Sequence, residues 1–119
     1  MRILTINTHS VQEERYSVML EEFIDSVIRE RPDIIAMQEV NQTAAAVEIA
    51  PESLKGLFPI PGDVNIRKDN HAAVVAKRLN EAGIACYWAW LPIKIGYDRY
   101  DEGVALLSLG NPITAIDRF

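Results

Sequence analysis

The chain has 119 residues, a formal net charge of −5, and 49% hydrophobic and 24% charged residues. This composition provides one compact core and excludes a disordered, collagen-like or coiled-coil protein. No apolar run approaches the roughly 20 residues that a membrane-spanning helix needs. The single cysteine, Cys86, excludes an internal disulfide and most cysteine metal sites.

The mild acidity disfavours wide electrostatic capture of nucleic acid, which requires a basic face. The amino terminus has one basic residue and a β-like run without a small-residue cleavage site, which argues against a signal peptide. We therefore expect a cytoplasmic protein.

The first 40 residues predict a strand, a helix and a second strand. Residues 2–7, RILTIN, are apolar and β-branched, as in a strand that is covered on both faces. Ser10 and Glu13 have capping-box spacing and predict that a helix starts near them. Residues 33–40, DIIAMQEV, predict a second two-sided strand parallel to the first, and Pro32 ends the helix. The helix carries an apolar stripe made of Tyr16, Met19, Leu20, Phe23, Ile24, Val27 and Ile28.

Residues 41–69 have no sustained period and carry three prolines and two glycines. They predict a long loop with one helical turn near Pro51, and loops of this length are usually functional or mobile. Asp69 or Asn70 is expected to cap a second helix over residues 71–82.

Four segments follow in the rest of the chain. Residues 84–93 and 103–109 predict two further strands, the second covered on both faces, and residues 94–102 predict a polar connection between them. Residues 113–119 are expected to begin another strand. The aromatic residues and the cysteine of the first of these strands are expected to pack in the core, namely Trp88, Trp90 and Cys86.

Asn7 closes the first predicted strand and Glu39 closes the second. If these strands are parallel neighbours, an amide and a carboxylate meet at one edge, where ligands of such sheets bind. These are oxygen ligands that suit Mg²⁺, which takes one or two carboxylates and retains several waters. A solvated Glu39, or one that caps a nearby backbone group, explains the same pattern, and Asn is common where strands turn into loops. The two histidines are His9, near this edge, and His71, which is expected to face solvent or a loop.

The sequence ILTINTHS, the later MQEV and then YDEGVALLS occur in an order that resembles the endonuclease/exonuclease/phosphatase superfamily, which includes pancreatic deoxyribonuclease. The resemblance implies hydrolysis of phosphoesters with Mg²⁺ or Mn²⁺, with Glu39 as metal ligand and Asn7 beside the metal or the scissile phosphate. It implies that Tyr100 and Glu102 contact phosphate or orient a catalytic histidine. From its position, His9 is expected to reach substrate.

The implied fold is α/β, a four-layer sandwich of two sheets with helices outside. Residues 1–119 are expected to form a single amino-terminal portion of that domain, its first half, with helices on the outer face of a mixed sheet. The family's later Asp-x-Asn and Asp-His pairs are not found, and residues 62–65, GDVN, come too early to supply the first of them. The fragment alone is therefore expected to be inactive.

The alternative is a non-catalytic α/β half-domain that acts as an interaction or regulatory module. A sheet built to face another sheet would expose an apolar face. We therefore expect the fragment to form a homo-oligomer through that face, to pair with its missing half, or to be partly disordered. Asn41 follows QEV, where some nucleases place a basic residue. The absence of a basic residue at this position favours a small phosphoester or a lipid headgroup over nucleic acid as substrate.

Overall fold

The computed structural model describes residues 1–9, 15–62, 64–97 and 99–116. Its elements in chain order are β1 (Ile3–Asn7), α1 (Tyr16–Glu30), β2 (Ile34–Thr43), the 3₁₀ turn η2 (Pro51–Ser53), α2 (His71–Glu81), β3 (Cys86–Tyr97) and β4 (Tyr100–Leu109).

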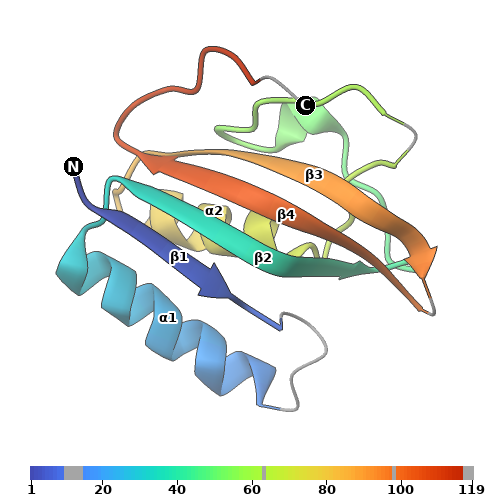
Figure 1. Cartoon of the computed structure of the whole chain (residues 1–119), viewed down its shortest axis with the longest axis horizontal. Coiled ribbons are helices and arrows are strands. Elements are labelled where there is room, and N and C mark those ends of the chain that lie inside the picture. The colour runs from blue at the N-terminus through green and yellow to red at the C-terminus, as the bar shows by residue number, and fades with distance from the viewer. Residues whose placement is uncertain (10–14, 63, 98, 117–119) are drawn as a thin grey trace.

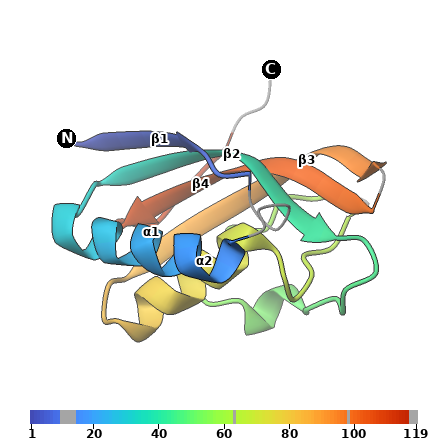
Figure 2. The same cartoon turned by 90° about the horizontal axis from the view of Figure 1, so that it is seen from below.

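The four strands form one mixed sheet in the order β1-β2-β4-β3 (Figure 1). β1 and β2 are parallel, as the strand–helix–strand pattern predicts, while β4 runs antiparallel to both β2 and β3. Both α-helices lie on the same face of the sheet (Figure 2). The predicted fold class, α/β with helices on one face of a mixed sheet, is confirmed. Among the described residues, no helix is long and apolar enough to cross a membrane.

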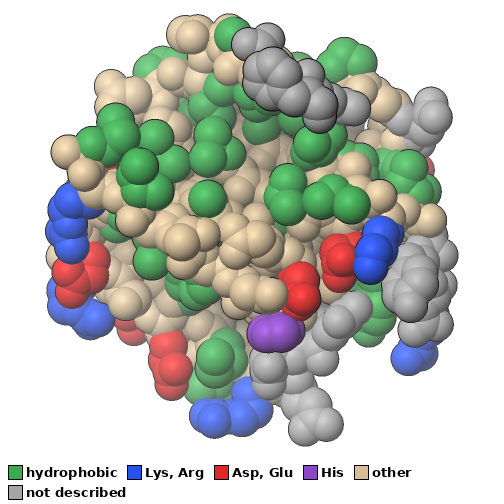
Figure 3. Space-filling view, in the orientation of Figure 1, with side chains coloured by type: hydrophobic (Ala, Val, Ile, Leu, Met, Phe, Trp, Pro, Cys, Tyr) green, Lys and Arg blue, Asp and Glu red, His purple; other side chains and the backbone are tan. Residues whose placement is uncertain are grey.

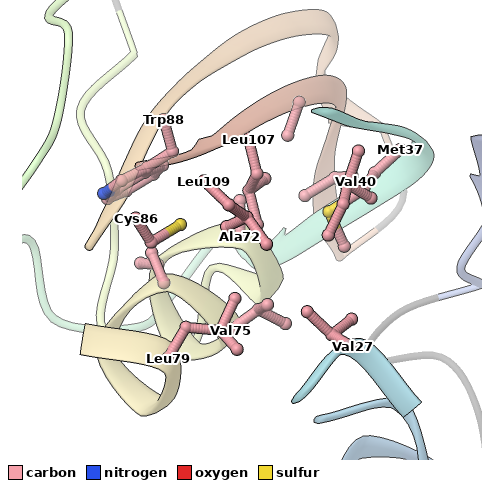
Figure 4. Packing of buried hydrophobic residues seen from close by; sticks show 14 of the residues in the cluster. Val27, Met37, Val40, Ala72, Val75, Leu79, Cys86, Trp88, Leu107 and Leu109 are labelled. Atoms are coloured by element: carbon pink, nitrogen blue, oxygen red, sulfur yellow. The ribbon is translucent and has the colours of Figure 1, made fainter. Parts of the chain in front are cut away.

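The core lies between this face of the sheet and the two helices (Figure 4). Side chains alternate along strands, so every second strand residue points toward the helices. Trp88, Leu107 and Met37 are buried on this side, as predicted for Trp88. The α1 stripe is only partly covered, because Met19 remains 48% exposed at its margin. The helical contributions to the core are Leu20, Ile24, Val27, Ala72, Val75, Ala76 and Leu79.

The strands are not covered on both faces, so the prediction of two-sided strands is wrong for the described residues. β1 is an edge strand whose exposure alternates, and Ile3 is 65% exposed. In β4, Leu106 is 37% exposed whereas its neighbour Leu107 is fully buried. We call the face opposite the helices the open face. Its apolar residues made these strands resemble fully buried ones in the sequence.

The predicted polar connection at residues 94–102 is instead the paired end of a hairpin. β3 extends to Tyr97 and β4 begins at Tyr100, which pair with each other. Two register shifts in β3 accommodate this irregular stretch. Residues 113–116 are not in a strand, so the expected final strand is absent there, and residues 117–119 lie outside the described part of the chain.

The ends of the helices follow mostly local signals. Asn70 caps α2, because its Oδ1 accepts from the N–H of Ala73 at 3.2 Å. Gly83 follows α2 with a φ of +86°, which suits glycine. α1 begins at Tyr16, and the proposed capping-box residues Ser10 and Glu13 lie outside the described residues.

The long segment after β2 is anchored to the sheet by the buried side chain of Gln42. Its Nε2 donates to Asn65 O at 2.9 Å and to Asp101 Oδ2 at 3.0 Å. Its Oε1 accepts from Arg67 N at 2.8 Å and from Asn70 Nδ2 at 3.0 Å. A fully satisfied buried amide of this kind orders a loop that has little regular structure of its own.

Candidate functional site at the end of β1 and the bulge of β2

The candidate site lies where β1 ends beside the middle of β2. The expectation that Glu39 closes the second strand is wrong, because β2 continues to Thr43. Asn7 is the last residue of β1 and pairs with Gln38, so Glu39 follows directly beside it. His9 connects the two side chains. Its backbone N–H donates to Asn7 Oδ1 at 3.2 Å, and its Nδ1 lies 2.8 Å from Glu39 Oε2. We call Asn7, His9 and Glu39 the rim site.

Glu39 sits in a β-bulge. The register of β2 with β4 shifts between Met37 and Val40, and Glu39 has a φ of +53°. Bulges of this kind break the alternation of side chains and redirect one of them. The Glu39 side chain is 37% exposed. Figure 3 shows a histidine side chain at the surface with an acidic side chain next to it.

The carbonyl groups of the bulge accept hydrogen bonds from Thr8, which follows β1, and from Trp90 of β3. Thr8 donates from its N–H to Gln38 O at 3.0 Å and from Oγ1 to Glu39 O at 3.0 Å. Trp90 donates its indole N–H to Val40 O at 3.0 Å. Sequence analysis did not identify Thr8 or these contacts. The only signal for Thr8 was its place between Asn7 and His9.

No protein-family model and no curated protein matches this chain. The solved structure of an endonuclease/exonuclease/phosphatase family protein from Leptotrichia buccalis C-1013-b is similar to this chain. The match covers 91% of this chain, with 31% identity and a TM-score of 0.71. The chain belongs by its fold to the endonuclease/exonuclease/phosphatase superfamily. An endonuclease/exonuclease/phosphatase from Beutenbergia cavernae DSM 12333 also covers 91% of the chain, with 16% identity and a TM-score of 0.51, and supports the fold alone. The chain spans 37% and 25% of the lengths of these two proteins.

The donor set of the rim site fits the metal ions of the superfamily. A carboxylate and an amide oxygen are ligands for a hard cation such as Mg²⁺, which needs few protein ligands because water and substrate complete its shell. Within the described residues, no group of three His, Cys, Asp or Glu side chains is arranged to hold a metal. A closed site with several protein ligands, as structural zinc requires, is therefore not present in that part of the chain.

The two further residues that the superfamily resemblance implies lie on β4. Glu102 pairs with Asn41, two residues beyond Glu39, and its Oε2 lies 4.0 Å from Lys94 Nζ. Tyr100 pairs with Thr43 at the far end of the β2–β4 ladder. Since strands rise about 3.3 Å per residue, Tyr100 is displaced by roughly 10 Å along β2 from the bulge. The structure thus places Glu102 near the rim site and Tyr100 away from it.

His71 is buried, contrary to the expectation that it faces solvent or a loop. Asn41 is also buried, and the preference for a small substrate, which rests on the absence of a basic residue at this position, stays a prediction. His71 is 5% exposed and its Nδ1 lies 2.8 Å from the Tyr16 hydroxyl. Burial lowers the pKa of His71 to about 4. Burial, together with the charge of Asp69, raises the pKa of Tyr16 to about 12. His71 therefore joins the two helices as a neutral core residue.

Proposed function

We propose that this chain supplies the metal-binding rim of a phosphoester hydrolase that uses Mg²⁺ or Mn²⁺. In this proposal, Glu39 is a metal ligand and Asn7 lies beside the metal or the scissile phosphate. The observation that carries the proposal is that the two side chains come together at one edge, bridged by His9, in a chain with this superfamily's fold. Members of the superfamily are typically hydrolytic.

A bound divalent cation would neutralise the charge that develops on the phosphoryl group and would activate the attacking water. The protein's own residues orient the reactants. In this proposal His9 contacts substrate and also restrains Glu39, with which it forms an ion pair. Glu102, on the neighbouring strand β4, is a further candidate for substrate contact. Tyr100 is a more distant candidate contact. The substrate is a phosphoester. The net charge of −5 favours a small phosphoester or a lipid headgroup over nucleic acid.

Metal binding is the direct test, because it does not require a complete active site. We expect isothermal titration with Mn²⁺ to show binding that weakens at least about 10-fold in Glu39→Gln, which removes the charge and retains the shape. Glu52→Gln is the matched control, since Glu52 is an exposed carboxylate on η2. Equal affinities for wild type and Glu39→Gln would refute the role of Glu39.

Turnover is a separate measurement. The superfamily's Asp-x-Asn and Asp-His pairs are not found in these 119 residues, so we expect no Mn²⁺-dependent hydrolysis of bis-p-nitrophenyl phosphate above that of Glu39→Ala. Hydrolysis by the chain that Glu39→Ala abolishes would show that the residues present suffice for catalysis.

The second candidate function is a non-catalytic interaction or regulatory module. The open face favours it, because Ile3 and Leu106 expose apolar surface there. Under this alternative the chain would bind no Mn²⁺ at Glu39 and would associate through the open face. The Mn²⁺ titration therefore separates the two candidates.

A further inference from the structure

We infer that Trp90 is a positioning residue of the rim site, which acts by holding the backbone bulge that presents Glu39. This inference rests on the proposed role of Glu39 as a metal ligand and explains how the chain sets the direction of that carboxylate. The indole N–H of Trp90 does not donate to a side chain of the rim site. It acts through the carbonyl of Val40, the residue next to Glu39.

The bulge requires external support. A φ of +53° places Glu39 in the left-handed region, which is unfavourable for residues other than glycine, asparagine and aspartate. Such a conformation persists when surrounding contacts fix it. Three successive carbonyls of the bulge, those of Gln38, Glu39 and Val40, accept hydrogen bonds from outside β2.

Trp90 reaches the bulge from β3 although β4 lies between β3 and β2. The indole of Trp90 passes over Gly103 of β4, the residue that pairs with Val40 of β2. A Cβ atom at Gly103 would lie 2.7 Å from Trp90 Nε1 and 2.4 Å from Leu91 O. Only glycine leaves room for the indole there. This accounts in physical terms for the glycine in the EGVALLS segment that resembles the superfamily.

Thr8 supports the same bulge from the opposite side. It follows β1 directly, and its hydroxyl lies 3.1 Å from Gln38 O and 3.0 Å from Glu39 O. The bulge is thus held between a hydroxyl from the β1 side and an indole from the β3 side. Residues that orient metal ligands without touching the metal commonly change its affinity by 10-fold or more.

Trp88 provides a matched control for Trp90. The two residues lie two positions apart on β3, both are nearly fully buried, and both donate an indole N–H to a carbonyl at 3.0 Å. The acceptor of Trp88 is Lys55 O, in the segment after η2 and outside the rim site. Replacing either residue with Phe removes an indole N–H donor and leaves a smaller aromatic ring in the core. Only Trp90→Phe removes a hydrogen bond to the bulge.

The test compares Trp90→Phe with Trp88→Phe in the whole chain by Mn²⁺ titration and thermal unfolding. We expect both to lower Tm, and we expect Trp90→Phe alone to weaken Mn²⁺ binding by about 10-fold. Equal Mn²⁺ affinities for the two variants would overturn the inference. If Trp90→Phe does not fold, Thr8→Val tests the same bulge from the β1 side, with a loss of Mn²⁺ affinity expected and an unchanged affinity contradicting it.

Hydrogen exchange distinguishes failure of this inference from failure of the proposed function. We expect exchange across residues 36–41 to be faster in Trp90→Phe than in Trp88→Phe, whether or not the chain binds metal. Wild type that binds no Mn²⁺ would refute the metal role of Glu39 alone. Unchanged exchange across residues 36–41 in Trp90→Phe would refute the positioning role of Trp90.

Discussion

His9 contacts both proposed ligands of the rim site, because its Nδ1 lies 2.8 Å from Glu39 Oε2 and its backbone N–H donates to Asn7 Oδ1. His9 itself has a φ of +49°, so the chain turns sharply just after β1. This turn brings a residue two positions past Asn7 back over the strand end. The positions of the amide and the carboxylate are therefore coupled through one imidazole and one peptide group.

We predict that His9→Asn weakens Mn²⁺ binding by about 10-fold, because the imidazole orients the Glu39 carboxylate. Asparagine tolerates the left-handed backbone at this position, so the substitution removes the imidazole contact with little backbone strain. Isothermal titration measures the effect, and thermal unfolding checks that the fold is retained. Tighter binding in His9→Asn would show instead that His9 competes with the cation for Oε2.

The placement of Asn7 close to Glu39 was predictable, because it depends only on the order of the elements along the chain. Each residue follows an apolar run, and a helix between two strands makes those strands parallel. The bulge and its support were not predictable in this way. The contact of Trp90 with Val40 requires β4 to lie between β2 and β3, and nothing in the sequence of β3 specifies that order.

Strand pairing and burial were two further properties that the local sequence patterns predicted wrongly. Polar residues around Tyr97 and Tyr100 suggested a loop, but backbone pairing with the neighbouring strand made them a hairpin. His71 follows a helix cap, where residues are often solvated, yet α1 packs across it and Tyr16 binds its ring. In both cases a tertiary neighbour determined the outcome.

We predict that the chain loses stability as the pH falls from 7 to 5, owing to His71. Its folded pKa of about 4 lies below its ordinary value of 6.5, so the unfolded chain binds more protons between these values. The stabilisation is complete above the unfolded pKa and is lost as the pH falls toward the folded one. The expected loss between pH 7 and pH 5 is about 2 kcal/mol. Urea unfolding at the two pH values measures it.

The control for this pH dependence is His71→Gln, whose amide can still accept from the Tyr16 hydroxyl but does not titrate. The variant should be less stable at pH 7 and should lose markedly less stability than wild type on acidification. An equal loss in both proteins would assign the pH dependence to other groups.

We predict that Gly103→Ala destabilises the fold by about 1–3 kcal/mol, because overpacking forces neighbouring groups to shift. The new methyl group would meet Trp90 Nε1 and Leu91 O at distances below 3.0 Å. Gly62→Ala is the matched control, since a Cβ there meets no atom within 4 Å. Denaturant unfolding gives both values, and a Gly103→Ala protein as stable as Gly62→Ala would contradict the close packing of the indole.

We predict that the chain self-associates through the open face and that Leu106→Asp reduces this association. Leu106 is 37% exposed on that face, near a hollow of about 280 Å³ that Ile60 and Ile116 also line. A charge at this position makes burial against another apolar surface costly. Val47→Asp is the control, because Val47 is 71% exposed but lies outside the sheet. Sedimentation velocity over a range of concentrations should show wild type and Val47→Asp associating and Leu106→Asp remaining smaller. Wild type that stays monomeric throughout would contradict the prediction.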